Sequence, residues 1–158
     1  MQADHVGKTD GMSWGANGVL VVAEGGRLVL GSENGGTLRP LPGSAAPSGR
    51  GVRYPLMMRD GENVLYTDWS GSDVGSKIKA RSIRTGTITD LGLPGSAVIG
   101  VVQGFLVYWS GVTLRAAPFD ERARRVIAES QQVLAGVAGM GFPALSATGT
   151  LLYFAGAD

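Results

Sequence analysis

The chain has 158 residues, of which 44% are hydrophobic and 17% charged, so it can bury a core and is too apolar for a disordered segment. Its 14 basic and 13 acidic residues give a net charge of +1, which argues against a nucleic-acid partner and against binding to an anionic membrane surface. The absence of cysteine excludes disulfides, thiolate zinc sites and cysteine nucleophiles.

Residues 1–10 are expected to form a polar N-terminal arm. They lack the apolar centre of a signal peptide, and no apolar run in the chain is long enough for a membrane-spanning helix. The compartment stays open between the cytoplasm and an extracytoplasmic space. Residues 11–158 are interpreted as a single repeat domain.

A turn with glycine, followed by a short apolar strand, recurs four times along this domain. The turn glycines are Gly18, Gly61, Gly104 and Gly149, at intervals of 43, 43 and 45 residues. In the first three units a second turn follows the strand, and a closing segment then ends in glycine, as in Leu41-Pro42-Gly43. A unit of this length with four short strands is typical of a β-propeller blade.

The predicted strands follow in chain order. They lie near 11–15, 18–23, 27–31 and 37–41, then 53–58, 63–68, 77–82 and 87–91, then 97–102, 104–109, 112–117 and 131–134, and finally 140–146 and 150–155. The corresponding blades span 11–52, 53–95 and 96–136, with a half blade over 137–158. Residues 122–134 could form a helix, but a turn and a strand are favoured. The prediction is an all-β fold, a partial β-propeller of about 3.5 four-stranded antiparallel blades.

Several motifs support a family resemblance. The stretch Ser13-Trp14-Gly15-Ala16-Asn17-Gly18 resembles the Ser-Trp-Ser-Pro-Asp-Gly opening of TolB-type (WD40-like) propeller repeats, as found at the C-terminus of some bacterial serine/threonine kinases. Asp60-Gly61 with Val64-Leu65-Tyr66 is similar to a second such blade, and Leu114 to Asp120 and Leu145 to Tyr153 look like the next two. The resemblance implies a scaffold that binds a protein or ligand and has no common catalytic residues. Asn17 and Gln103 replace the aspartate that is usual before the turn glycine.

The loop that begins at Trp69 is the best candidate for a binding surface. It is the longest predicted loop within a blade, it is polar and glycine-rich, and Trp69 is expected to be exposed there. With Arg53, Tyr54 and Asp73 nearby, this tryptophan could form a recognition surface. Asp68 belongs to the same group. We expect Trp14 and Trp109, by contrast, to pack in the core between sheets.

Catalytic and metal-binding alternatives are less well supported. Gly11-Met12-Ser13-Trp14-Gly15 fits the nucleophile-elbow pattern of hydrolases, but that motif needs a following helix and a later histidine, and the sole histidine is His5. The spacing of Asp68 and Asp73 does not match a calcium-binding loop. No metal site, cofactor or catalytic residue is therefore predicted. The alternative function is a propeller hydrolase that uses acidic residues near the central channel.

The number of blades suggests a partner. Closed propellers contain about 4–8 blades, and three and a half would leave one apolar face exposed at each end. Such faces favour association. We therefore expect a homodimer that completes a ring, with a protein or small molecule as a further partner, unless the chain belongs to a longer propeller.

Overall fold

A computed structural model describes residues 9–43, 51–72, 74–136 and 143–154. These residues form strands and turns, with no helix among them, and no helix that could cross a membrane is present in these ranges. The Asp73 carboxylate of the predicted recognition surface lies outside the described residues, as does most of the predicted N-terminal arm.

Fifteen strands follow one another within the described ranges. They are β1 (Thr9–Trp14), β2 (Val19–Glu24), β3 (Arg27–Ser32), β4 (Arg39–Pro40), β5 (Gly51–Met57), β6 (Asn63–Trp69), β7 (Lys77–Ser82), β8 (Ile88–Pro94), β9 (Ala97–Val102), β10 (Phe105–Ser110), β11 (Thr113–Asp120), β12 (Arg125–Val126), β13 (Gln131–Ala135), β14 (Ala144–Leu145) and β15 (Leu151–Leu152).

The strands form four antiparallel sheets in sequence order. The first sheet is β1-β2-β3-β4, the second β5-β6-β7-β8, the third β9-β10-β11 with β12 and β13, and the last β14-β15. In the first, second and last sheets consecutive strands are neighbours, as is typical of antiparallel strands joined by turns. In the third sheet β9, β10 and β11 follow this order, whereas β12 and β13 both pair with β11. The predicted all-β arrangement of four-stranded sheets is therefore confirmed.

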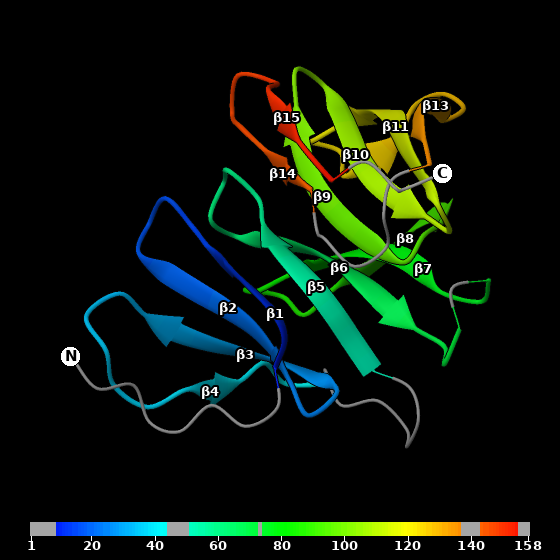
Figure 1. Cartoon of the computed structure of the whole chain (residues 1–158). Helices are drawn as coiled ribbons and strands as arrows, with labels where there is room; N and C mark the ends of the chain where they lie inside the picture. Colours follow the sequence, from blue (N-terminus) through cyan, green and yellow to red (C-terminus); the bar gives the residue numbers. More distant parts are fainter. Residues whose placement is uncertain (1–8, 44–50, 73, 137–142, 155–158) are drawn as a thin grey trace.

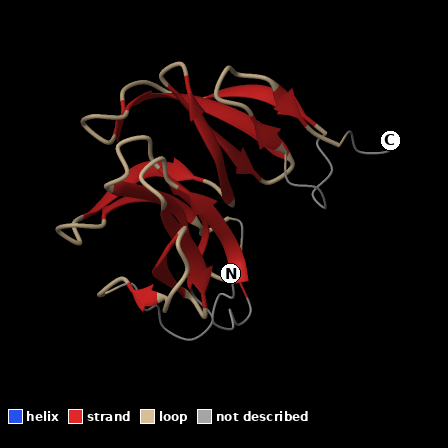
Figure 2. Cartoon of the chain, turned by 90° about the vertical axis from the view of Figure 1, so that its left-hand side faces the viewer, coloured by secondary structure: helices blue, strands red, loops and turns tan. Residues whose placement is uncertain are grey.

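The sheets are stacked face to face in an open, curved row (Figure 1). The first strand of each sheet lies beside the first strand of the next, so that β1, β5, β9 and β14 run along the inside of the row. The view turned by 90° shows the sheets fanning out from this inner side (Figure 2).

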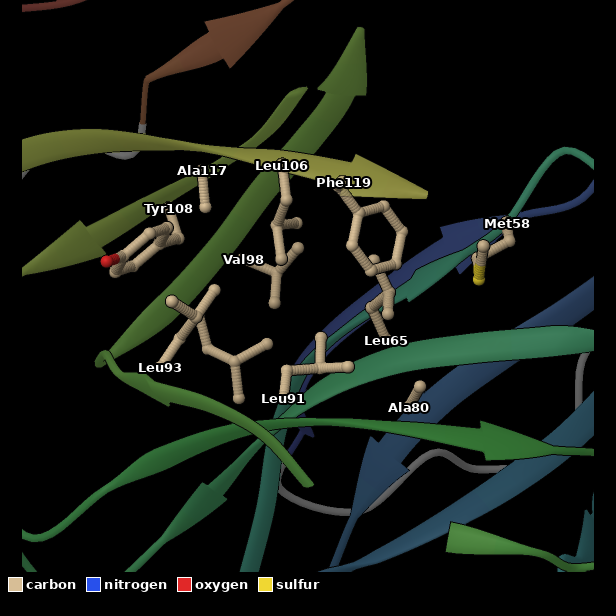
Figure 3. Close-up of a cluster of buried hydrophobic side chains, with 11 residues drawn as sticks. Met58, Leu65, Ala80, Leu91, Leu93, Val98, Leu106, Tyr108, Ala117 and Phe119 are labelled. Carbon is tan, nitrogen blue, oxygen red and sulfur yellow. The ribbon is translucent and has the colours of Figure 1, made fainter. Parts of the chain in front are cut away.

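Alternating side chains explain this stacking, because each strand presents one apolar set of residues to the sheet before it and one to the sheet after it. On β6, Val64 and Tyr66 pack against the first sheet, whereas Leu65 packs against the third. The largest cluster lies between the second and third sheets, where Leu65, Leu91 and Leu93 meet Leu106 and Phe119 (Figure 3).

The region with helical potential contains a turn and two short strands. Residues 121–124 form the turn, after which β12 pairs with the end of β11 and β13 pairs with its beginning. Between them, Arg115 donates to the hydroxyl and the carbonyl of Ser130, at 3.1 and 2.8 Å. The fourth strand of this sheet is therefore split in two.

The tryptophans correct one prediction from the sequence. Trp109 is buried, as expected, but the side chain of Trp14 is 57% exposed instead of lying in the core. Trp14 is on the face of the first sheet that points away from the second, where no described sheet covers it. Trp69, predicted to be exposed, is half-buried.

Candidate functional site

The inner strands β1, β5 and β9 line a pocket of about 500 Å³. Its wall includes Asp10 and Gly11 from β1, Tyr54 and Pro55 from β5, and Ile99 from β9. Met12, Ser13, Leu56, Val98, Thr9 and Pro143 complete the lining. The size of the pocket is typical of ligand sites, and its wall combines apolar side chains with polar groups.

Each of the three strands has an irregularity at this pocket. The pairing of β1 with β2 slips between Thr9 and Met12, and that of β5 with β6 slips between Arg53 and Leu56. On β9 the pairing skips Ile99. A β-bulge leaves backbone groups outside the ladder and is common beside functional sites. We call this site, lined by residues 10–11, 54–55 and 99, the bulge pocket.

The backbone conformation at two bulges is unusual. Gly11 has φ of 117°, and a Cβ atom placed on it would lie 3.1 Å from the Cα of Tyr54, so a side chain at position 11 would crowd β5. Tyr54 itself has φ of 49°. A left-handed conformation at a residue other than glycine costs on the order of 1–3 kcal/mol and clusters at functional sites.

A charged and aromatic group stands at the edge of the pocket. The guanidinium of Arg53 lies over the ring of Trp69, 4.2 Å from its centroid, and Arg53 Nε is 3.9 Å from Asp10 Oδ1. A cation over an indole face is attracted by the negative face of the ring. The predicted residues Arg53, Tyr54 and Trp69 therefore lie together, on adjacent strands.

Asp10 is a member of this group that the sequence did not single out. It falls at the end of the polar segment that was interpreted as an arm, whereas β1 begins at Thr9. The glycine that follows Asp10 was the available signal, since an isolated glycine in a strand often marks a bulge.

Asp68 belongs to a different surface from Trp69, because consecutive side chains of a strand point to opposite faces. Its carboxylate accepts a hydrogen bond from Lys79 Nζ at 2.6 Å. Lys79 lies opposite Asp90, whose pKa is lowered mainly because its carboxylate accepts a hydrogen bond from the Gly92 amide. These charges form a polar strip across the second sheet, and no group of three metal-binding side chains occurs within the described ranges.

Ser13 is held in a structural role despite its motif. Its hydroxyl accepts a hydrogen bond from the Met57 amide at 3.0 Å, which ties the first sheet to the second. The residues after it form a turn and then β2, not a helix. The nucleophile-elbow geometry requires a strand followed by a helix, and this segment does not provide it.

A second, more polar pocket of about 510 Å³ lies between the second and third sheets. Its charged residues are Asp60, Glu62, Arg84, Glu121, Arg122 and Arg124. Arg124 donates to the Asn63 side chain at 2.9 Å. The three arginines face an equal number of acids, so this pocket has no excess of either charge.

Comparisons with solved structures identify β-propellers as similar folds. The chain matches a nidogen/laminin complex with a TM-score of 0.59 at 13% identity, over 89% of this chain and 52% of that chain. It matches the Dos1 propeller with a TM-score of 0.61 at 13% identity, over 92% and 42%. A protein of unknown function from Bacteroides caccae matches with a TM-score of 0.54 at 16% identity, over 91% and 52%.

These matches support the propeller part of the sequence resemblance and show the fold alone. The chain spans about half the length of the solved structures it matches, which agrees with a partial propeller. No protein-family model matches the sequence, and no curated protein does either. The narrower TolB-type resemblance, and with it the likeness to kinase C-termini, stays a prediction.

Proposed function

We propose that this chain is a non-catalytic β-propeller scaffold that binds a small ligand or a segment of a partner protein in the bulge pocket, and that self-association completes its ring. The observation that carries the proposal is that bulges on three successive inner strands line one pocket. The three departures from regular pairing fall at equivalent positions of the repeat and meet at one place, and one of them holds Tyr54 at a positive φ, which supports a site there.

The chemistry of the pocket suggests what could bind. Pro55, Leu56, Val98 and Ile99 give an apolar wall, while Arg53 and Asp10 place both charges at one edge. A ligand with an aromatic or aliphatic body and one polar end would match this division. Displacing Asp10 would leave Arg53 free to bind a carboxylate while it still lies over Trp69.

The alternative, a propeller hydrolase, has less support. Glycoside hydrolysis, the common acid-based reaction, needs two carboxyl groups flanking the scissile bond. Among the described residues that line the bulge pocket, Asp10 supplies the single carboxylate. We therefore favour binding over catalysis.

Amide chemical shifts test the proposal without a known ligand. We would titrate the protein with a panel of small aromatic acids, aromatic amines and neutral aromatic compounds. We expect saturable shifts centred on Gly11, Tyr54 and Ile99, with the acids weakened in Arg53→Ala. Arg39→Ala, which removes an exposed arginine on β4, is the matched control.

Either of two results would contradict the proposal. One is a panel that produces no saturable shift near the bulges. The other is binding whose shifts all lie elsewhere, for example in the polar pocket around Arg84 and Arg122.

A further inference from the structure

The turns of three units share one hydrogen-bonding pattern, although the turn of the second unit has one residue more than the other two, and this pattern allows their faces to be compared. The same pair of backbone hydrogen bonds closes each turn after the inner strand, beginning at Gly15, at Met58 and at Ser146. The residues just before these turns, Trp14, Met57 and Leu145, therefore occupy one position of the repeat.

This position faces the preceding sheet. Met57 pairs with Val64, and both are buried between the first and second sheets. Leu145 pairs with Leu151, and both pack against the third sheet. The equivalent pair in the first sheet is Trp14 with Leu20. Trp14 is 57% exposed because no described sheet precedes it.

In the last sheet it is the opposite face, the one that points away from the third sheet, that has no described sheet beside it. Leu152 follows Leu151, so it occupies the position of Leu65 in the second sheet and of Val21 in the first, and both of those are fully buried against the following sheet. Leu152 is 72% exposed, and Phe154, two residues later, is 67% exposed. Among the described residues no sheet covers this face.

The two uncovered faces are therefore of complementary kinds. Every internal interface joins the forward face of one sheet to the backward face of the next, and the described residues leave one backward face (Trp14, Leu20) and one forward face (Leu152) without a partner. Phe154, just beyond the end of β15, is exposed as well. Pairing one face with the other continues the stacking that already exists inside the chain. Pairing a face with its own kind would not.

From this complementarity we infer that two copies of the chain associate head to tail in a closed ring. The ring has two equivalent interfaces, and in each one Trp14 and Leu20 of one copy pack against Leu152 and Phe154 of the other. The inference rests on the scaffold function proposed above and specifies its self-association. Two copies bring twice the four sheets of one chain, within the range of about 4–8 found in closed propellers. A two-fold dimer is also the commonest closed assembly.

Light scattering after size-exclusion chromatography gives the first test. At micromolar concentration we expect a mass of about twice 16.3 kDa for the unaltered chain. Trp14→Asp and Phe154→Asp should each weaken the dimer by about 30-fold or more, as expected for a buried aromatic anchor. Val112→Asp is the control, since Val112 is equally exposed but lies in the turn between β10 and β11. Circular dichroism would confirm that each variant is folded.

Mixing the two variants distinguishes head-to-tail pairing from other arrangements. Trp14→Asp retains an intact forward face and Phe154→Asp an intact backward face, so the mixture should form a heterodimer through one intact interface. A mixture that stays monomeric would overturn the inference. So would a Phe154→Asp variant that still dimerises, because it would indicate that Trp14 faces pair with each other.

The unaltered chain provides the last outcome. If it is a folded monomer at micromolar concentration, the ring inference fails. Ligand-induced shifts at the bulge pocket would still be measurable in that monomer, so this failure is distinguishable from failure of the proposed binding function.

Discussion

Asn17 and Gln103 occupy the position that Asp60 holds in the second unit, and their amides explain the departure from the usual aspartate. Asn17 Nδ2 donates to the Gly61 carbonyl at 3.1 Å, and Gln103 Nε2 donates to the Thr148 carbonyl at 3.5 Å. Each bond reaches the equivalent turn of a later unit. An aspartate carboxylate is an acceptor only and cannot make this bond.

Replacing Asn17 with Asp tests this role. The carboxylate can still accept the bond from the Val19 amide, but it loses the donor to Gly61 and places a negative charge beside a carbonyl. We expect the free energy of unfolding to fall by about 1 kcal/mol. Asn34→Asp, at an exposed turn of the first sheet, is the matched control in denaturant unfolding. Equal losses in the two variants would show that the bond to Gly61 contributes nothing.

Tyr66 makes stability depend on alkaline pH. Burial, followed by the nearby Asp68 carboxylate, raises the pKa of its phenol from 10.0 to about 12. Because the folded protein favours the neutral phenol, this contribution to stability is fully present below pH 10 and is lost as the pH rises towards 12. The shift corresponds to about 2–3 kcal/mol.

Urea unfolding at pH 8 and at pH 11.5 measures this effect. The unaltered chain should lose more stability between the two values than Tyr66→Phe, in which no phenol can ionise. If the two proteins lose the same amount, ionisation of Tyr66 is not coupled to unfolding.

At the scale of strands and turns, the connection between β6 and β7 differs from its equivalents. It covers residues 70–76, whereas the connections at 25–26 and 111–112 have two residues each. The buried Ser76 hydroxyl ties the base of this loop by donating to the Ser72 carbonyl at 2.6 Å and accepting from the Ser70 amide at 3.2 Å. Val74, near its tip, is 94% exposed.

Limited proteolysis with elastase, which cleaves after small aliphatic residues, should therefore cut first at Val74. Val112 offers an internal control, since it is also exposed but sits in a two-residue turn between strands that are locked in a ladder. Ser76→Ala should speed cleavage at Val74 by loosening the base of the loop. First cleavage at another site would refute this assignment.

The sequence predicted the strands well because the repeat of apolar runs and turn glycines is local and recurs. Gly11 was a local signal for the bulge on β1, but the bulges at Tyr54 and Ile99 had no such signal, because a bulge is a property of pairing between two strands. The same limit explains Trp14. Trp14 and Trp109 were both predicted to lie in the core because of their residue type, whereas the burial of each depends on whether another sheet covers it.

The residues of the predicted site also differ in how well the sequence placed them. Arg53 and Trp69 were predicted to lie near each other, and the structure places the Arg53 guanidinium over the Trp69 ring. Asp68 was grouped with them by proximity in the chain, yet strand alternation places it on the opposite face with Lys79. Asp10 was missed because it comes from another sheet.

At the scale of the whole molecule, the proposed dimer would make the curved row of sheets one half of a ring, with its inner strands around the bulge pocket. Where a sheet lies beside it, the position of Trp14 is buried at Met57 and half-buried at Leu145, and the position of Leu152 is fully buried at Val21 and Leu65. A substitution that disrupts either end face would then lower solubility as well as break the dimer, because it leaves apolar surface exposed on both copies.

Pulsed dipolar electron spin resonance measures this arrangement most directly. The chain has no cysteine, so Arg84→Cys at an exposed turn of the second sheet gives a single labelling site on each copy. For the proposed head-to-tail dimer we expect one narrow distribution of distances between the labels of two copies, which is lost when Trp14→Asp is added. A featureless background decay, or a distribution that Trp14→Asp leaves unchanged, would contradict it.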